Sequence, residues 1–97
     1  MPTVLITGTS TGIGRVTAEV LAQRGWQVFA TMRDLQRREK LEVALKKSGL
    51  QDRVEFIQLD LNDAASIEAA VATVLSRTGG TLDAVVQNAG VSAAGAA

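Results

Sequence analysis

The chain has 97 residues, which is enough for one small domain or part of a larger one, and 46% of them are hydrophobic, as in a buried α/β core. Ten acidic residues balance ten basic ones, so no net charge steers the chain toward nucleic acid or an acidic membrane. The absence of cysteine excludes disulfides and thiolate metal sites, and the absence of histidine as well argues against any metal site of the zinc type.

The amino-terminal residues show neither the charged segment of a signal peptide nor an apolar stretch long enough to span a membrane. We therefore expect a cytoplasmic protein without a membrane span. Tyrosine is also absent, so two common acid–base side chains, tyrosine and histidine, are missing from this sequence.

The first predicted strand, residues 3–7, runs into a glycine-rich turn that reads T-G-T-S-T-G-I-G over residues 7–14. Gly8 allows a tight turn, Gly12 lets the backbone approach a pyrophosphate, and Gly14 lets the next helix lie close to the sheet. The N–H groups and the positive dipole end of that helix would face the anion. Glycine spacing alone also fits an ordinary turn or tight helix packing.

Helical periodicity follows the turn and ends at Gly25, which is a typical C-cap. The apolar stripe of this helix consists of Ile13, Val16, Val20 and Leu21. A second strand is predicted at residues 27–32. The helix after it opens at Asp34 as a possible N-cap and ends at Ser48-Gly49. Its apolar face consists of Leu41, Ala44 and Leu45.

The third strand is predicted at residues 54–59 and the fourth at residues 82–87. Between them, a helix starts at Asn62 or Asp63 and stops at Gly79-Gly80. Its apolar stripe consists of Ile67, Ala70, Val71, Val74 and Leu75.

The starts of the four strands lie 24, 27 and 28 residues apart, and each gap holds one helix. This alternation predicts a three-layer α/β fold of the Rossmann type, with a four-stranded parallel sheet and three crossover helices. Right-handed crossovers give the strand order 3-2-1-4. The glycine turn and the segment Asn88-Ala89-Gly90 would then meet at the carboxyl edge, beside the switch point between strands 1 and 4.

Arg33 follows Met32 at the end of the second strand, where a carboxylate would accept hydrogen bonds from the adenosine 2′-hydroxyl of NAD. A guanidinium there suits a 2′-phosphate, which it can hold with paired, charge-assisted hydrogen bonds. We therefore predict NADP(H) as the cofactor in preference to NAD. The alternative is that Arg33 is a solvated charge at the start of a loop.

Asp60 and Leu61 follow the third strand at the same edge of the sheet. A carboxylate can accept a hydrogen bond from the adenine amino group while the leucine covers the ring. Asp60 can equally cap the third helix or turn the chain into it, and the sequence leaves both roles open.

The motif T-G-x-x-x-G-I-G, the pair Asp60-Leu61 and the segment Asn88-Ala89-Gly90, at these intervals, resemble the classical short-chain dehydrogenases/reductases over residues 3 to 92. The segment V-F-A-T-M-R-D-L at residues 28–35 is similar to the NADP-preferring hydroxysteroid and retinol dehydrogenase branch. The resemblance implies that the pyrophosphate and its ribose contact Gly8, Ser10, Thr11, Gly12, Ile13 and Gly14. The resemblance also implies that Arg33 binds the 2′-phosphate and that Asp60 and Leu61 contact adenine. The nicotinamide-side ribose would contact Asn88, Ala89 and Gly90.

The resemblance also implies hydride transfer between the nicotinamide and an alcohol or ketone, with a tyrosine and a lysine four residues later moving the proton. This sequence has no Tyr-x-x-x-Lys, and Ser92 lies too close to the fourth strand to match the serine of the family. Its lysines, all on the polar surface of the second helix, are Lys40, Lys46 and Lys47. We therefore expect no catalytic residue in residues 1–97, which would form the cofactor-binding half of a Rossmann domain without the catalytic half.

Three alternatives stay open: the amino-terminal part of a longer oxidoreductase, a non-catalytic nucleotide-binding or sensor module, and a half-sheet scaffold. The edge of the fourth strand would offer unpaired N–H and C=O groups beside apolar side chains. We expect self-association, or completion by another polypeptide, through this edge.

Overall fold

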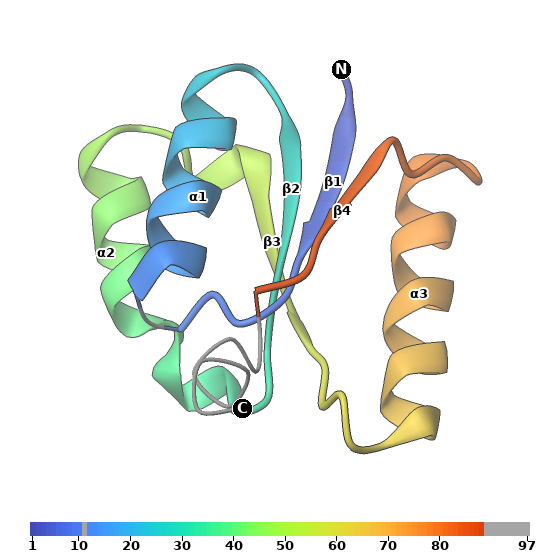
Figure 1. The fold of residues 1–97 in the computed structure, drawn as a ribbon. Helices are drawn as coiled ribbons and strands as arrows, with labels where there is room; N and C mark the ends of the chain where they lie inside the picture. Colours follow the sequence, from blue (N-terminus) through green and yellow to red (C-terminus); the bar gives the residue numbers. More distant parts are fainter. Residues whose placement is uncertain (11, 89–97) are drawn as a thin grey trace.

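The computed structural model describes residues 1–10 and 12–88. Four parallel strands form a sheet in the order β3-β2-β1-β4. The strands are β1 (Thr3–Ile6), β2 (Gln27–Met32), β3 (Val54–Gln58) and β4 (Ala84–Val86). The helices α1 (Gly12–Gln23) and α2 (Glu39–Lys47) cover one face of the sheet, and α3 (Ala64–Thr78) covers the other (Figure 1). The three-layer α/β fold and the strand order predicted from the sequence are confirmed.

Helices cover both faces of the sheet, which explains why its central strands β1 and β2 are buried and mostly apolar. In β1, Val4 and Ile6 belong to the core beneath α1 and α2, whereas Leu5 belongs to the core beneath α3. Phe29 of β2 extends the second core and is completely buried. Because side chains alternate along a strand, β1, β2 and β3 each contribute to both cores.

The apolar stripe predicted for α1 is not the face that meets the sheet. The buried residues of α1 are Gly14, Ala18 and Ala22, which recur at every fourth position on one side of the helix. The larger residues of the stripe are exposed by 71% at Ile13, 51% at Val16 and 38% at Val20. These three residues are exposed because a helix that lies close to a sheet needs small side chains at the contact. Only Leu21 of the predicted stripe packs partly against the core.

The second helical segment begins where the sequence predicted, but its first turn has a different geometry. Asp34 accepts a hydrogen bond from the backbone N–H of Gln36 and caps the 3-10 helix η1 (Leu35–Arg38), after which α2 begins. A second 3-10 turn, η2 (Gln51–Arg53), leads into β3. A 3-10 turn at the start of an α-helix is common.

The third helix has the capping residues that the sequence predicted. The carboxylate of Asp63 accepts hydrogen bonds from the backbone N–H groups of Ala65 and Ser66, so Asp63 and not Asn62 is the N-cap. Gly79 ends the helix with a left-handed φ of 75°.

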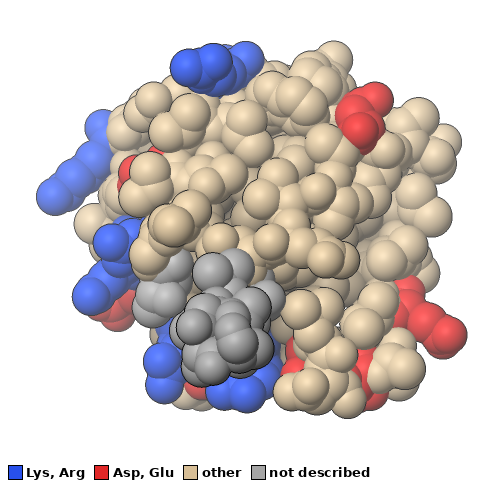
Figure 2. Space-filling model, viewed as in Figure 1, with Lys and Arg blue, Asp and Glu red and all other residues tan. Residues whose placement is uncertain are grey.

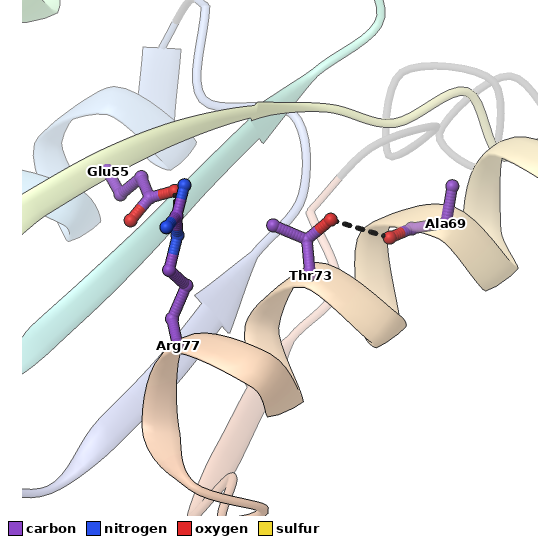
Figure 3. A network of polar contacts seen from close by, with 4 residues as sticks. All are labelled: Glu55, Ala69, Thr73 and Arg77. Carbon is purple, nitrogen blue, oxygen red and sulfur yellow. Dashed lines mark hydrogen bonds and ion pairs between the residues drawn. The ribbon is translucent and has the colours of Figure 1, made fainter.

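An ion pair also joins α3 to the sheet, since Arg77 Nε lies 3.0 Å from Glu55 Oε2 of β3 (Figure 3). The Arg77 side chain is 59% exposed, so the pair contributes about 0–1 kcal/mol. Burial of Val74 on the same helix stabilises the contact by about 1.5–3 kcal/mol. Apolar packing therefore dominates the docking of α3. One turn before Arg77, the Thr73 hydroxyl donates to the carbonyl of Ala69 within the helix (Figure 3).

Candidate functional site

The glycine turn between β1 and α1 uses each of its glycines differently. Gly8 and Gly12 have φ values of 68° and 59°, a region that other residues adopt only with strain. A Cβ built on Gly12 would have no atom within 4 Å, so the space above this residue is open. A Cβ on Gly14 would lie 2.1 Å from the carbonyl oxygen of Gly8. The predicted role of Gly14 in close packing is confirmed, while the open side of Gly12 leaves room for a ligand.

Asn88 ties the glycine turn to the end of β4. Its backbone N–H donates to Thr7 Oγ1 at 2.8 Å, and its side-chain amide lies 3.5 Å from the carbonyl of Gly8. The backbone N–H of Thr7 donates to Val86 of β4 at 3.0 Å. The ends of β1 and β4, predicted to meet at the switch point, are therefore joined by backbone and side-chain hydrogen bonds.

Two buried threonines, which sequence reasoning missed, tie the same turn to β2. Thr9 donates from both its backbone N–H and its hydroxyl to the carbonyl of Thr31, at 3.1 and 3.0 Å. The Thr31 hydroxyl donates to the carbonyl of Ile6 at 2.8 Å. Both side chains are completely buried. Thr31 is a hydroxyl residue inside an otherwise apolar run, and Thr9 is one of several hydroxyl residues in the glycine turn. Neither pattern is unusual enough to single these residues out.

Arg33 is exposed immediately after β2, and its guanidinium has no hydrogen-bond or ion-pair partner within residues 1–10 and 12–88. A charged fork without an internal partner is available to an anionic ligand. This arrangement fits the predicted 2′-phosphate contact and equally fits a solvated charge.

The sequence left two roles open for Asp60, a turn into the third helix and a contact with adenine. The structure shows the first of these. Its carboxylate Oδ1 accepts from the backbone N–H of Asn62 at 2.9 Å, and its carbonyl accepts from the N–H of Asp63. The residue thus turns the chain toward the N-cap of α3. The other carboxylate oxygen has no partner among the described residues, and the neighbouring Leu61 is 43% exposed.

The predicted site residues that the structure describes lie at the carboxyl edge of the sheet, because they follow the ends of parallel strands (Figure 1). The contacts above bring Gly8, Gly14 and Asn88 together. Ser10 lies in the turn and is partly buried, while Ile13 is exposed on α1. The remaining predicted residues, Thr11, Ala89 and Gly90, lie outside the described residues.

The donors at this edge fit an anionic group. The first turn of α1 contains no acidic side chain, and its leading N–H groups have no partner within the helix. Arg15 in that turn adds a positive charge. On the face in Figure 2, basic side chains gather on the side of α1 and α2, whereas the clearest acidic ones lie on the side of α3. The open glycine turn and the nearby cations therefore suit a diphosphate.

A separate shallow hollow of about 260 Å³ lies where η1 meets α2. It is lined by Leu35, Gln36, Arg38, Glu39 and Glu42. None of these was predicted as a site residue, and Arg38 and Glu42 form an exposed pair within one helical turn, at 3.8 Å. We therefore place the candidate site at the glycine turn, where the first backbone N–H groups of α1 have no partner within the helix.

Comparison with known proteins identifies the relatives of this chain. The family model for short-chain dehydrogenases matches residues 2–97. The chain belongs to the short-chain dehydrogenase/reductase family. Short-chain dehydrogenase PC-15 of Penicillium crustosum is 46% identical over 89 residues, which is 91% of this chain and 30% of that protein. The structure of a menthone neomenthol reductase from Mentha piperita aligns with a TM-score of 0.83 and 34% identity, over 91% of this chain and 31% of that one.

The chain thus spans about 30% of the length of these relatives. Members of the family bind NAD or NADP, and similar structures include an actinorhodin polyketide ketoreductase with NADPH (30% identical) and a 3-ketoacyl-(acyl-carrier-protein) reductase from Brucella melitensis with NADH (27% identical). Family membership therefore leaves the choice between the two cofactors to the residues of the site. None of the helices in the described part of the chain has the length and hydropathy needed to cross a bilayer.

Proposed function

We propose that residues 1–97 form the NADP(H)-binding domain, the N-terminal half, of a short-chain oxidoreductase. The whole protein would transfer hydride between the nicotinamide and an alcohol or ketone, and this chain alone would bind the cofactor without catalysis. The observation that carries the proposal is the glycine turn, where Gly14 packs against Gly8 while the space above Gly12 stays open. Such a turn presents helix N–H groups to a diphosphate.

The residues at the strand ends would hold the rest of the cofactor. The partnerless guanidinium of Arg33 would bind the 2′-phosphate, and Asp60 and Leu61 would contact adenine. On the other side of the switch point, the segment from Asn88 to Gly90 would line the nicotinamide-side ribose. When bound, the cofactor would supply the hydride, and the residues of this chain would bind and orient it.

The absence of tyrosine supports the proposal that this chain is inactive by itself, because a hydroxyl substrate must lose a proton as hydride leaves. The purified chain should bind NADPH yet oxidise none of it when mixed with a panel of small ketones. Turnover by the purified chain would contradict this part of the proposal. The predicted cytoplasmic location stays a prediction.

The cofactor preference is tested by the Arg33→Ala variant in equilibrium titrations with NADPH and NADH. We expect NADPH binding to weaken by about 1.5–3 kcal/mol, the usual contribution of hydrogen bonds to a charged group. NADH lacks the 2′-phosphate, so its affinity should not change. Equal losses for the two cofactors would contradict the assignment of Arg33. The matched control is Arg24→Ala, an exposed arginine beyond the other end of α1.

A scaffold function is favoured by one observation, the exposed edge of the sheet. β4 lies at the end of the strand order, and its Val85 is 53% exposed. We propose that this edge takes part in self-association or receives a completing polypeptide. If millimolar NADPH fails to bind the protein, the scaffold becomes the better account of this chain.

A further inference from the structure

A continuous line of hydrogen bonds joins the ends of β2 and β3. The backbone N–H of Asp60 donates to Ser66 Oγ at 2.8 Å, and the Ser66 hydroxyl donates to Gln58 Oε1 at 3.2 Å. The Gln58 amide then donates from Nε2 to the backbone carbonyl of Arg33 at 3.2 Å. Each member uses its donor and acceptor in one consistent direction, which fixes the orientation of the Gln58 amide.

The strand register explains why Gln58 reaches Arg33. Gln58 is paired with Met32, the last residue of β2, and the N–H of Leu59 donates to the Met32 carbonyl at 2.9 Å. Arg33 is the first residue beyond this ladder. Beyond the last backbone hydrogen bond between β2 and β3, the Gln58 side chain therefore supplies the next hydrogen bond between the two segments.

Because of this bond, the backbone beneath the arginine is held while its side chain remains exposed. The guanidinium itself has no partner among the described residues. Within that part of the chain, the Gln58 amide is the one side chain that hydrogen-bonds to Arg33, and it does so at the backbone carbonyl. A restrained backbone lowers the conformational entropy that the segment at Arg33 still has to lose when the residue binds a ligand.

We propose that Gln58 is a positioning residue that sets the preference for the adenosine 2′-phosphate by holding the backbone of Arg33. The inference rests on the proposed function, since it requires that Arg33 binds the 2′-phosphate. Ser66 supports the same line by orienting the Gln58 carbonyl oxygen, and it ties the line to Asp60 on the adenine side.

The test is the ratio of NADPH to NADH affinity in the full natural protein carrying Gln58→Ala, measured by titration. We expect NADPH to bind about 2- to 10-fold more weakly, the range for one hydrogen bond, with NADH affinity unchanged. Gln58→Met keeps the length of the side chain without adding a charge and has no donor for Arg33, so it should also lower the ratio. Gln51→Ala is the matched control, since Gln51 is exposed in η2 before the opposite end of β3.

A double-mutant cycle separates positioning from general support. Once Arg33 is alanine, the further change Gln58→Ala should leave the ratio unaltered, because Gln58 acts through the arginine. Additive effects of the two substitutions, or an unchanged ratio in Gln58→Ala alone, would overturn the inference. Wild-type protein that shows no preference for NADPH would instead overturn the proposed function, and with it this inference.

Discussion

Gly14 shows how one missing Cβ positions a site. The carbonyl of Gly8 and the amide of Asn88 both approach the place where a side chain would begin. In an ordinary helix, replacing glycine with alanine stabilises the helix by about 1 kcal/mol. At this position we expect an alanine to lower stability instead, because its Cβ would clash with a backbone atom that has little freedom to move.

We therefore predict that Gly14→Ala lowers the free energy of unfolding by about 1–3 kcal/mol, the usual cost of overpacking. Urea denaturation of the two proteins measures the difference. The control is Gln23→Ala at the exposed end of the same helix, which should change stability by less than about 0.5 kcal/mol. A stabilised Gly14→Ala protein would contradict the close contact between α1 and the turn.

The site residues were predictable to the extent that they depend on local chemistry. Glycines at the turn and Arg33 after β2 stand out in the sequence because their residue types are unusual for those positions. Thr9, Thr31 and Gln58 do not, since their roles arise from partners 22 or more residues away. Which residues become hydrogen-bond partners across strands depends on the register of the strands in the folded protein, and this register cannot be derived from one sequence.

At the scale of the elements, α1 is the instructive case. Its periodicity predicted a helix correctly, but its apolar stripe is not the face that packs against the sheet. Hydrophobicity ranks Ile13 and Val16 above Ala18, but the close approach that Gly14 permits selects small residues at the contact. In α2 and α3, which lack such a glycine, the predicted Leu41, Leu45, Ala70 and Val74 are buried. Val71 and Leu75, at the margin of the stripe predicted for α3, are 37% and 38% exposed.

The orientation of α1 is tested by a pair of substitutions on opposite faces. Val16→Gln should change the free energy of unfolding by less than about 0.5 kcal/mol, because Val16 is exposed. Ala18→Leu should destabilise by about 1–3 kcal/mol, because Ala18 is fully buried against the sheet. Thermal or chemical denaturation measures both, and the reverse order of effects would show that the predicted stripe is the inner face.

At the scale of the whole molecule, apolar groups remain uncovered on both sides. Ile13 and Val16 are exposed on α1, and Val71 and Leu75 are partly exposed on α3. Val85 on the edge strand is exposed as well. The strand order and both cores followed from the alternation of strands and helices, whereas these faces depend on what packs against them.

We predict that the purified chain associates with itself at the β4 edge, and that Val85→Lys reduces the association. A lysine on an edge strand opposes edge-to-edge pairing through its charge. Sedimentation equilibrium over a range of concentrations gives the measurement, with Val43→Lys on the exposed side of α2 as the control. Wild-type protein that stays monomeric at every concentration would refute the prediction.

The central claim is that the backbone of the glycine turn holds the diphosphate of a nicotinamide dinucleotide. A crystal structure of the protein with NADPH tests it most directly. We predict diphosphate oxygens within about 2.7–3.2 Å of the backbone N–H groups in the first turn of α1, with the 2′-phosphate at Arg33. A dinucleotide bound at any other place, or a turn closed by side chains in the complex, would contradict the account.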